Sequence, residues 1–261
     1  MTPLGDVWAN HRSTAAWRRS RASEIPESLG RVVTALVSTL VNGDLADQLD
    51  RLAAGYTVLS RLLVSTPSAA AVDALRDPTL LATWPLPSPA AESGLALMTA
   101  ARGEPYDDIT ADYAALFVGP GPVSAVPYES VHLSEEGLLF EEQTLQVRES
   151  YAALGLAAPR LNREPDDHVG LEFEFVGTGC LQALDALHRG DDDRLAQVLR
   201  LISLFAHEHL FAWVPNLMRL VTTNARTTFF RGVGTLGAAA LTWLGEVEWV
   251  GPPQSESPNA Q

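Results

Sequence analysis

The sequence predicts an all-α fold, and two features of the chain lead to that prediction. Apolar residues recur at three- and four-residue steps through most of the chain, as between Leu45 and Ser65, and this spacing is that of a helix face buried against a core. Strand-like alternation is confined to a short case between Leu171 and Phe175, inside a longer helical pattern. No internal repeat is present, and we expect a single helical-bundle domain with an N-terminal extension.

The composition limits the classes of protein to which this chain can belong. The chain has 261 residues, of which 46% are hydrophobic and 19% are charged, which is enough to bury a full core. Its formal net charge is −14, whereas nucleic-acid-binding proteins show a basic balance, so we expect no nucleic-acid partner. The acidic balance is compatible with basic partners, with solubility or with a salty cytoplasm. The only cysteine, Cys180, excludes an intrachain disulfide and a thiolate metal cage, and its apolar neighbours predict a buried, inert thiol.

The N-terminal region contains a basic segment and an apolar run but does not form a secretory signal. Arg18 and Arg19 precede the run from Val32 to Val41, yet acidic residues and a proline separate the two parts, and no small-residue cleavage site follows. No apolar run reaches the ~18 residues of a membrane span, so we expect no stable membrane insertion. We expect residues 1–27 to be a flexible polar arm, 28–248 to be the helical domain and 249–261 to be a disordered tail.

Prolines and glycines divide the first half of the domain into helical segments. Asn42-Gly43-Asp44 is expected to end a first helix, and Pro67 a second. Three prolines between Pro85 and Pro89 predict a stiff linker. We therefore expect helices at residues 28–42, 45–65, 68–77, 90–102 and 105–117.

Residues 118–134 interrupt the helical pattern. Gly119-Pro120-Gly121-Pro122 and Pro127 prevent a continuous helix because proline lacks the backbone N–H that a helix interior needs. A loop of this length within a compact domain is more often functional than not. This loop is therefore a candidate binding segment.

The helical pattern resumes after this loop. Asp191-Asp192-Asp193 supplies an acidic first turn, whereas Trp213-Val214-Pro215 is expected to interrupt the chain so that Pro215 opens another helix. We expect helices at residues 135–154 and 166–188, from 191 to the interruption at Trp213, from Pro215 through Val221, and at 227–244.

Unusual chemistry is concentrated where the helix at 166–188 begins. The carboxylates of Glu164, Asp166 and Asp167 surround His168 in the sequence. Glu172 follows His168 by one helical turn, so their side chains are expected on one face. We expect Asp166 or Asp167 to cap this helix. Two interpretations remain open: a well-capped helix with a surface His–Glu pair, and a polar clamp for a cationic ligand.

The motifs of common catalytic sites are absent. There is no Gly-rich phosphate loop, no dinucleotide-binding GxGxxG after a strand and no nucleophile elbow. His207 and His209 are two residues apart, whereas the zinc-protease pattern needs a separation of four on a helix. We expect a buried polar pair there and no metal site. A metal- or cofactor-dependent helical enzyme would need ligands converging from His168, His207 and His209, and a structural interaction subunit of a redox complex is the other alternative.

Three separated segments form an ordered set of motifs. Asp112-Tyr113-Ala114-Ala115-Leu116-Phe117-Val118-Gly119-Pro120 leads to Pro127-Tyr128-Glu129-Ser130-Val131, Glu164-Pro165-Asp166-Asp167-His168 leads to Leu171-Glu172-Phe173-Glu174-Phe175, and Phe205, His209-Leu210 and Trp213-x-Pro215 follow. Their order and spacing resemble those of the TorD/DmsD family, cytoplasmic chaperones that mature molybdenum-containing redox enzymes exported by the twin-arginine pathway. The resemblance covers about residues 45–245.

The resemblance implies a cytoplasmic, all-helical chaperone with no catalytic reaction and no cofactor. It implies binding of the twin-arginine signal peptide and apo-form of a molybdoenzyme catalytic subunit, by a monomer or a helix-exchanged homodimer. His132, where the family commonly has an aromatic residue, and the first 44 residues depart from the family pattern. The resemblance places signal-peptide binding at Leu116, Phe117, Pro127, Tyr128, Glu129, Ser130, Asp166, Asp167 and His168.

The chemistry of a twin-arginine signal suits such a site. Guanidinium groups pair bidentately with carboxylates, and an apolar groove accepts the apolar stretch that follows them. Glu172 joins Glu129, Asp166 and Asp167 as a candidate carboxylate. Leu116, Phe117, Tyr128 and Phe175 are candidates for the apolar wall. The alternative for each aromatic residue is core packing, which we expect for Phe117 and Phe173.

The segment Trp17-Arg18-Arg19-Ser20-Arg21 itself presents paired arginines. A tethered segment reaches millimolar effective concentration, so this one is a candidate internal competitor for a groove that accepts arginines. The alternative is a solubilising tail.

Overall fold

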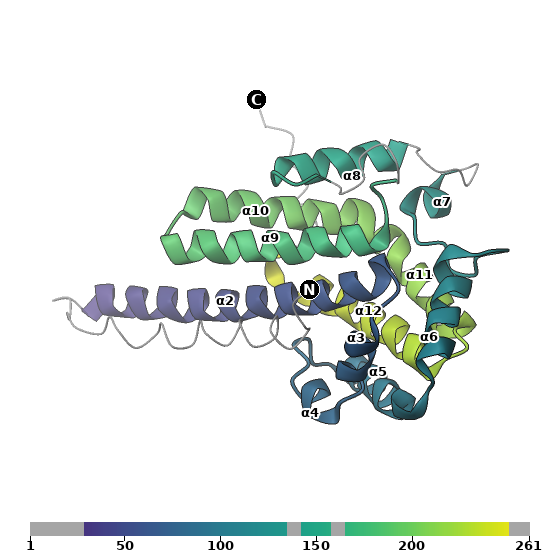
Figure 1. The fold of residues 1–261 in the computed structure, drawn as a ribbon. Coiled ribbons are helices and arrows are strands. Elements are labelled where there is room, and N and C mark those ends of the chain that lie inside the picture. Colours follow the sequence, from purple (N-terminus) through teal and green to yellow (C-terminus); the bar gives the residue numbers. More distant parts are fainter. Residues whose placement is uncertain (1–28, 135–141, 158–164, 251–261) are drawn as a thin grey trace.

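The structure, a computed structural model, describes residues 29–134, 142–157 and 165–250, with side chains described from Gly43 onward (Figure 1). Within these ranges the chain is helical and forms no β-strand, which confirms the all-α prediction. No helix in the described ranges combines the length and apolar character needed to cross a membrane. The expected polar arm (1–27) and the last 11 residues of the expected tail (251–261) lie outside the described residues.

The longest helix, α2 (Leu29–Val64), runs through Gly43 without a break, so the helix end predicted at Asn42-Gly43-Asp44 is wrong. A glycine inside a helix costs about 1 kcal/mol, whereas nucleating a second helix costs about 4 kcal/mol, so continuing the helix is the less unfavourable course. The short helices α3 (Ala69–Ala74) and α4 (Pro78–Leu81), the longer α5 (Pro89–Ala100) and the turn η2 (Ala101–Gly103) follow.

The candidate binding loop lies between two helical segments. Helix α6 (Tyr106–Tyr113) continues into the π-helical turn η3 (Ala114–Val118). Gly119 then has a φ of 96°, a conformation that favours glycine, and its peptide bond to Pro120 is cis. The irregular chain ends at the short helix α7 (Glu129–Leu133), as the break predicted for residues 118–134 requires.

The second half of the chain is dominated by long helices. After α8 (Glu142–Ala153) and α9 (Val169–Arg189), the chain from Asp192 to Asn224 is continuously helical. Pro215 lies inside the last of these helices, so the interruption predicted at Trp213-Val214-Pro215 is wrong. Figure 1 shows the first and last parts of this continuous helix pointing in different directions. A π-helical turn between them and Pro215 both favour such a bend. The parts of the continuous helix are α10 (Asp192–Phe205), the π-helical turn η4 (Ala206–Leu210) and α11 (Phe211–Asn224).

The last helix, α12 (Thr228–Glu246), begins at the expected position, with Thr227 as its N-cap. The turn η5 (Glu248–Val250) follows, and the Val250 side chain is buried. Ordered packing therefore extends two residues beyond the domain boundary expected at residue 248.

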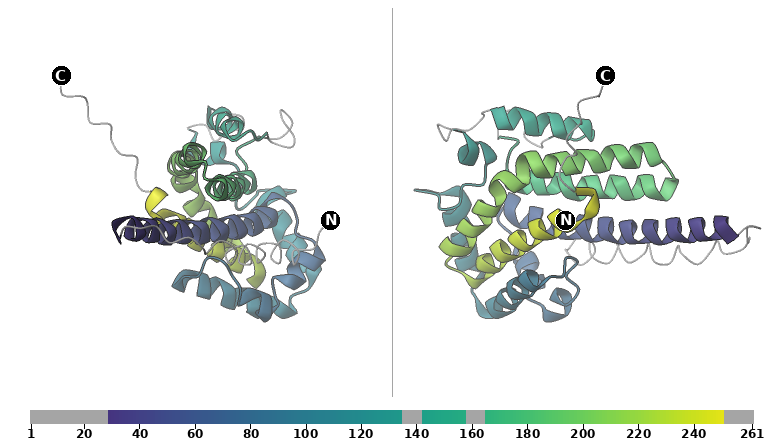
Figure 2. Two further views of the ribbon diagram at one scale, coloured as in Figure 1. Left: turned by 90° about the vertical axis from the view of Figure 1, so that its left-hand side faces the viewer. Right: turned by 180° about the vertical axis from the view of Figure 1, so that it is seen from behind.

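The helices pack in layers around α9. Helix α9 lies against α2 on one side and α10 on another, while α12 packs against α5 and α11 (Figures 1 and 2). Two glycines of α9 permit the close approach to α2. A Cβ atom at Gly170 would lie 2.8 Å from the backbone nitrogen of Val64, and one at Gly177 would lie 3.1 Å from the hydroxyl of Thr57. Larger residues at these positions would push the two helices apart.

The core contains both aromatic side chains for which the sequence predicted core packing. Phe173 is fully buried and meets Tyr56 edge to face, with ring centroids 5.0 Å apart. Phe117 is buried beside Tyr113, at 5.1 Å. Core packing, as predicted for Phe117 and Phe173, is confirmed. Cys180 is also buried, and burial raises the pKa of its thiol, in agreement with an inert side chain.

Candidate functional site

Two segments that are far apart in the sequence meet at the start of α9. The backbone N–H of Glu129 donates to the carbonyl of Asp167 (3.0 Å), and that of Val169 donates to the carbonyl of Pro127 (2.9 Å). These bonds form an isolated antiparallel bridge between Tyr128 and His168, whose half-buried rings meet edge to face at 5.2 Å. The bridge brings together the loop and the acidic segment that the sequence singled out.

Asp167 stabilises α7 and α8 and does not cap α9. One carboxylate oxygen accepts from the backbone N–H of Ser130 (2.7 Å), in the first turn of α7, and the other accepts from the hydroxyl of Thr144 (2.9 Å). The cap of α9 is His168, whose Nδ1 accepts from the backbone N–H of Gly170 (3.0 Å). The prediction that Asp166 or Asp167 caps this helix is therefore wrong, because both side chains bind partners from earlier segments of the chain.

Asp166 forms an ion pair with Arg148 of α8. The Nε of Arg148 donates to one oxygen of Asp166 at 2.5 Å, and the hydroxyl of Tyr151 donates to the backbone carbonyl of Asp166 at 3.1 Å. The side chain of Asp166 is fully buried, whereas 33% of the Arg148 side chain is exposed. The second oxygen of Asp166 is buried and has no hydrogen-bond partner among the described residues. Asp166 thus holds one guanidinium and retains one unused acceptor.

Glu129 forms a buried pair with His209 of η4. The Nδ1 of His209 lies 3.0 and 2.9 Å from the two carboxylate oxygens of Glu129, and both side chains are at most 2% exposed. The neighbouring His207 faces elsewhere, with its Nε2 2.7 Å from the carbonyl of Val250. The buried polar pair that we expected near these histidines is present at His209, with a partner that the sequence did not indicate.

Glu172 is an internal residue and does not form the surface pair with His168 that was one interpretation of the sequence. Its side chain is fully buried, and one oxygen accepts from the indole N–H of Trp213 (3.1 Å). The other oxygen has no hydrogen-bond partner in the part of the chain that the structure describes. Burial, with the nearby charges of Glu129 and Asp167, raises the pKa of Glu172 well above its ordinary value, and the Trp213 hydrogen bond acts in the opposite direction. The carboxylates of this site therefore lie behind the surface, within the protein.

Most of the candidate residues for the apolar wall of the site are buried in the core. Leu116 is fully buried, and its carbonyl accepts from the backbone N–H of Ala125 at 2.9 Å, which closes the base of the loop. Phe117 packs on Phe230 of α12, and Phe175 packs on Phe205, so both rings belong to the aromatic part of the core. Tyr128 alone of the four expected wall residues is partly exposed.

Other apolar side chains are exposed close to the site. Leu133 at the end of α7 is 39% exposed, and Leu145 in α8 is 56% exposed. The two short helices contact each other. The sequence did not single out these residues, because a leucine in a helical pattern is expected to face the core.

The three histidines that an enzyme of the metal-dependent type would need do not converge. His168 caps α9, His207 binds a backbone carbonyl and His209 binds Glu129. Among the residues that the structure describes, no group of three or more histidine, cysteine or acidic side chains has an arrangement suited to a metal ion.

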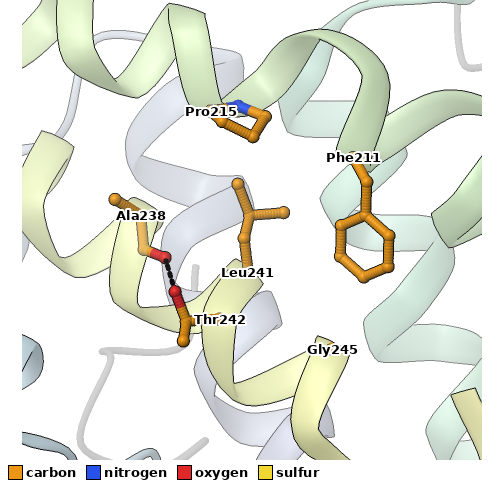
Figure 3. A pocket seen from close by; sticks show the side chains of 6 residues that line it. All are labelled: Phe211, Pro215, Ala238, Leu241, Thr242 and Gly245. Carbon is orange, nitrogen blue, oxygen red and sulfur yellow. Dashed lines mark hydrogen bonds between the residues drawn. The ribbon is translucent and has the colours of Figure 1, made fainter. Parts of the chain in front are cut away.

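A separate surface hollow of about 380 Å³ lies between α11 and α12 (Figure 3). The hydroxyl group of Thr242, in the wall of this hollow, donates to the carbonyl of Ala238 at 3.2 Å. The hollow therefore offers an apolar shape without an unpaired polar side chain to orient a ligand. Its lining consists of Phe211, Pro215, Ala238, Leu241, Thr242 and Gly245.

Comparison with known proteins shows which family the chain belongs to. Chaperone protein TorD of Vibrio cholerae serotype O1 is 30% identical over 141 residues, which are 54% of this chain and 60% of the relative. Chaperone protein TorD of Photobacterium profundum is 27% identical over 108 residues, 41% of this chain and 49% of the relative. The matches thus span 60% or less of these TorD sequences. The Tat proofreading chaperone DmsD of Salmonella typhi is 27% identical over 198 residues, 74% of this chain and 89% of the relative.

A family model described as "Nitrate reductase delta subunit" matches residues 85–219. This range includes the loop, the bridge and all the carboxylates described above, and it is just over half of the 261-residue chain. The chain therefore belongs to the nitrate reductase delta subunit family, in the TorD/DmsD group that its motifs resemble.

Proposed function

We propose that this protein is a cytoplasmic maturation chaperone. It binds the twin-arginine signal peptide and the apo-form of the catalytic subunit of a molybdenum-containing oxidoreductase before cofactor insertion and export. The observation that carries the proposal is the similarity to a Tat proofreading chaperone over 74% of the chain. The relatives are named as chaperones, and this supports a binding function without a catalytic step.

The hydrogen bonds of the site support Asp166 as the acceptor for an arginine of the peptide. Both oxygens of Asp167 and both oxygens of Glu129 already have partners. Glu172 has an unused oxygen but is fully buried, and its raised pKa favours the neutral acid. Asp166 has an unused oxygen and an arginine partner that is partly exposed to solvent.

An arginine of the peptide would exchange with Arg148. The side chain of Asp166 is fully buried, whereas that of Arg148 is 33% exposed. An incoming guanidinium that displaces Arg148 would take over the bond to Asp166 and gain the unused oxygen in a bidentate pair. The apolar stretch that follows the arginines would lie on Tyr128, Leu133 and Leu145, whose side chains are partly exposed.

Titration calorimetry tests this proposal. The ligand is a synthetic twin-arginine signal peptide of a molybdoenzyme, and the matched control is the same peptide with both arginines replaced by lysine. Lysine keeps the charge but loses the bidentate fork, so we expect binding about tenfold weaker for the lysine peptide. Equal affinities would remove the guanidinium exchange from the proposal, and no binding of either peptide would contradict the proposed function.

A further inference from the structure

A second pocket lies away from the site described above, where α2, α10, α12 and η5 meet. Its volume is about 550 Å³. Its walls combine two indole rings with three carboxylates and include no lysine or arginine. We call it the acidic tryptophan pocket, and it is lined by Asp44, Leu45, Gln48, Leu199, Trp243, Glu246, Val247, Glu248 and Trp249.

The carboxylates of this pocket have no cationic partner within the described part of the chain. Asp44 accepts a hydrogen bond from Gln48 (3.2 Å). Glu246 and Glu248 are exposed and take part in no ion pair among the described side chains. The chain has 32 acidic and 18 basic residues. Asp166 is paired with Arg148, whereas these three carboxylates are not paired with a basic side chain in the described part of the chain.

The two tryptophans indicate what kind of group the pocket fits. Trp243 and Trp249 are half-buried, and the indole N–H of Trp249 is buried without a hydrogen-bond partner. Guanidinium groups stack on indole faces and pair with carboxylates. The pocket therefore suits an arginine-containing peptide segment.

We propose that the acidic tryptophan pocket binds the chain's own N-terminal segment around Arg18 and Arg19. Residues 12–21 contain four arginines and no acidic residue, which complements the charge of the pocket. The length of the chain also fits. From Leu29 to Asp44 helix α2 rises about 22 Å, and the ten residues from Arg19 to Leu29 reach about 33 Å when extended.

The proposed contact is a property of this chain alone and does not depend on the proposed function. It gives the paired arginines an acceptor other than the Asp166 site. With an effective concentration of about 1 mM for the tethered segment, a dissociation constant of about 0.1 mM in the pocket would keep it roughly 90% bound.

Limited trypsin digestion of the full chain tests the contact. Trypsin cleaves after Arg18, Arg19 and Arg21, and a bound segment is cleaved only from its released state. The Glu246→Gln/Glu248→Gln variant should be cleaved about tenfold faster at these sites. Raising the salt concentration to 0.5 M should accelerate cleavage of the wild-type segment relative to the variant, because salt screens exposed charges.

The matched control is Asp73→Asn/Glu92→Gln, which removes two exposed carboxylates from α3 and α5. This variant should be cleaved at the wild-type rate. Equal cleavage rates in wild type and in the Glu246→Gln/Glu248→Gln variant, at low and high salt, would overturn the proposal.

Photocrosslinking identifies the acceptor directly. With p-benzoylphenylalanine in place of Trp17 in the full chain, we expect an intrachain crosslink to the peptide containing Trp243 and Trp249. Crosslinks that join two copies of the chain, or that map to the region around Asp166, would also contradict the proposal, because the segment would then lie against a partner or against the other site.

Discussion

Glu129 and His209 are 80 residues apart in the sequence, yet the Nδ1 of His209 lies within 3.0 Å of both carboxylate oxygens of Glu129 in the buried interior. Glu129 opens the short helix α7 after the loop, and His209 lies in the π-helical turn between α10 and α11. The pair therefore ties the candidate loop to the longest continuous helical path of the second half. We expect it to be structural.

Removing one partner of this pair should destabilise the protein. Glu129→Ala leaves His209 buried without its acceptor, and we expect a loss of about 3 kcal/mol in the free energy of unfolding, measured by urea denaturation. Glu208→Ala, at an exposed neighbour of His209, is the control and should change stability by less than about 0.5 kcal/mol. In a double-mutant cycle, Glu129→Leu with His209→Phe should cost less than the sum of the single changes; additive losses would mean that the two side chains are not coupled.

The raised pKa of Glu172 predicts a pH dependence of stability. In the unfolded chain this carboxyl titrates near its ordinary value of 4.5, whereas burial raises its pKa in the folded protein. The folded state then binds more protons than the unfolded state above about pH 4.5, so stability falls as pH rises towards the folded pKa.

Glu172→Gln should remove that dependence. Glutamine keeps an acceptor for the Trp213 indole N–H without the buried charge, so the variant should gain stability relative to wild type as pH increases from 5 to 8. Urea denaturation at several pH values measures the difference. Glu149→Gln, an exposed change in α8, is the control. A constant difference between wild type and Glu172→Gln across this range would contradict the assignment.

The two hydrogen bonds of Asp167 predict a contrast between two substitutions. Asp167→Ala removes the acceptors of the Ser130 N–H and the Thr144 hydroxyl, and we expect a loss of about 1–3 kcal/mol. Asp167→Asn keeps an acceptor for Ser130, and its amide can donate to the Thr144 oxygen, so it should lose about 1 kcal/mol or less. Thermal unfolding measures both, and equal losses would show that the charge is the main contribution.

The helix cap of α9 predicts a second contrast. His168→Ala removes the acceptor of the Gly170 N–H and should cost about 1 kcal/mol, while His168→Asn should restore most of that loss because asparagine caps well. Chemical denaturation of the two variants makes the comparison. If His168→Asn is no more stable than His168→Ala, capping is not the contribution of this side chain.

The sequence predicted the helices better than it predicted the site, for physical reasons. Periodicity reports burial along one helix, so the apolar face between Leu45 and Ser65 and the core position of Phe173 were correctly identified. Local breakers were less informative: Gly43 lies inside α2 and Pro215 inside α11. One unfavourable residue costs less than nucleating a second helix, so neither residue alone is sufficient to end a helix.

The acidic segment shows a different kind of limit. Adjacent carboxylates suggested a surface cluster, yet Asp166, Asp167 and Glu172 are all fully buried. Their partners, among them Arg148 and Trp213, come from other helices at separations of 18 to 41 residues. No rule of residue spacing predicts contacts between positions this far apart. The sequence therefore identified the charged residues of the site but not the residues that they contact.

The central claim, that Asp166 receives an arginine of a twin-arginine signal peptide, is tested most directly by a calorimetric cycle. The arginine and lysine forms of the peptide are titrated into the wild type, into Asp166→Asn and into the control variant Asp185→Asn. Asp185 is a suitable control because it also pairs with an arginine but is exposed at the other end of α9. We predict that wild type and Asp185→Asn prefer the arginine peptide about tenfold, and that Asp166→Asn binds both forms equally. An undiminished preference in a folded Asp166→Asn variant would contradict the account.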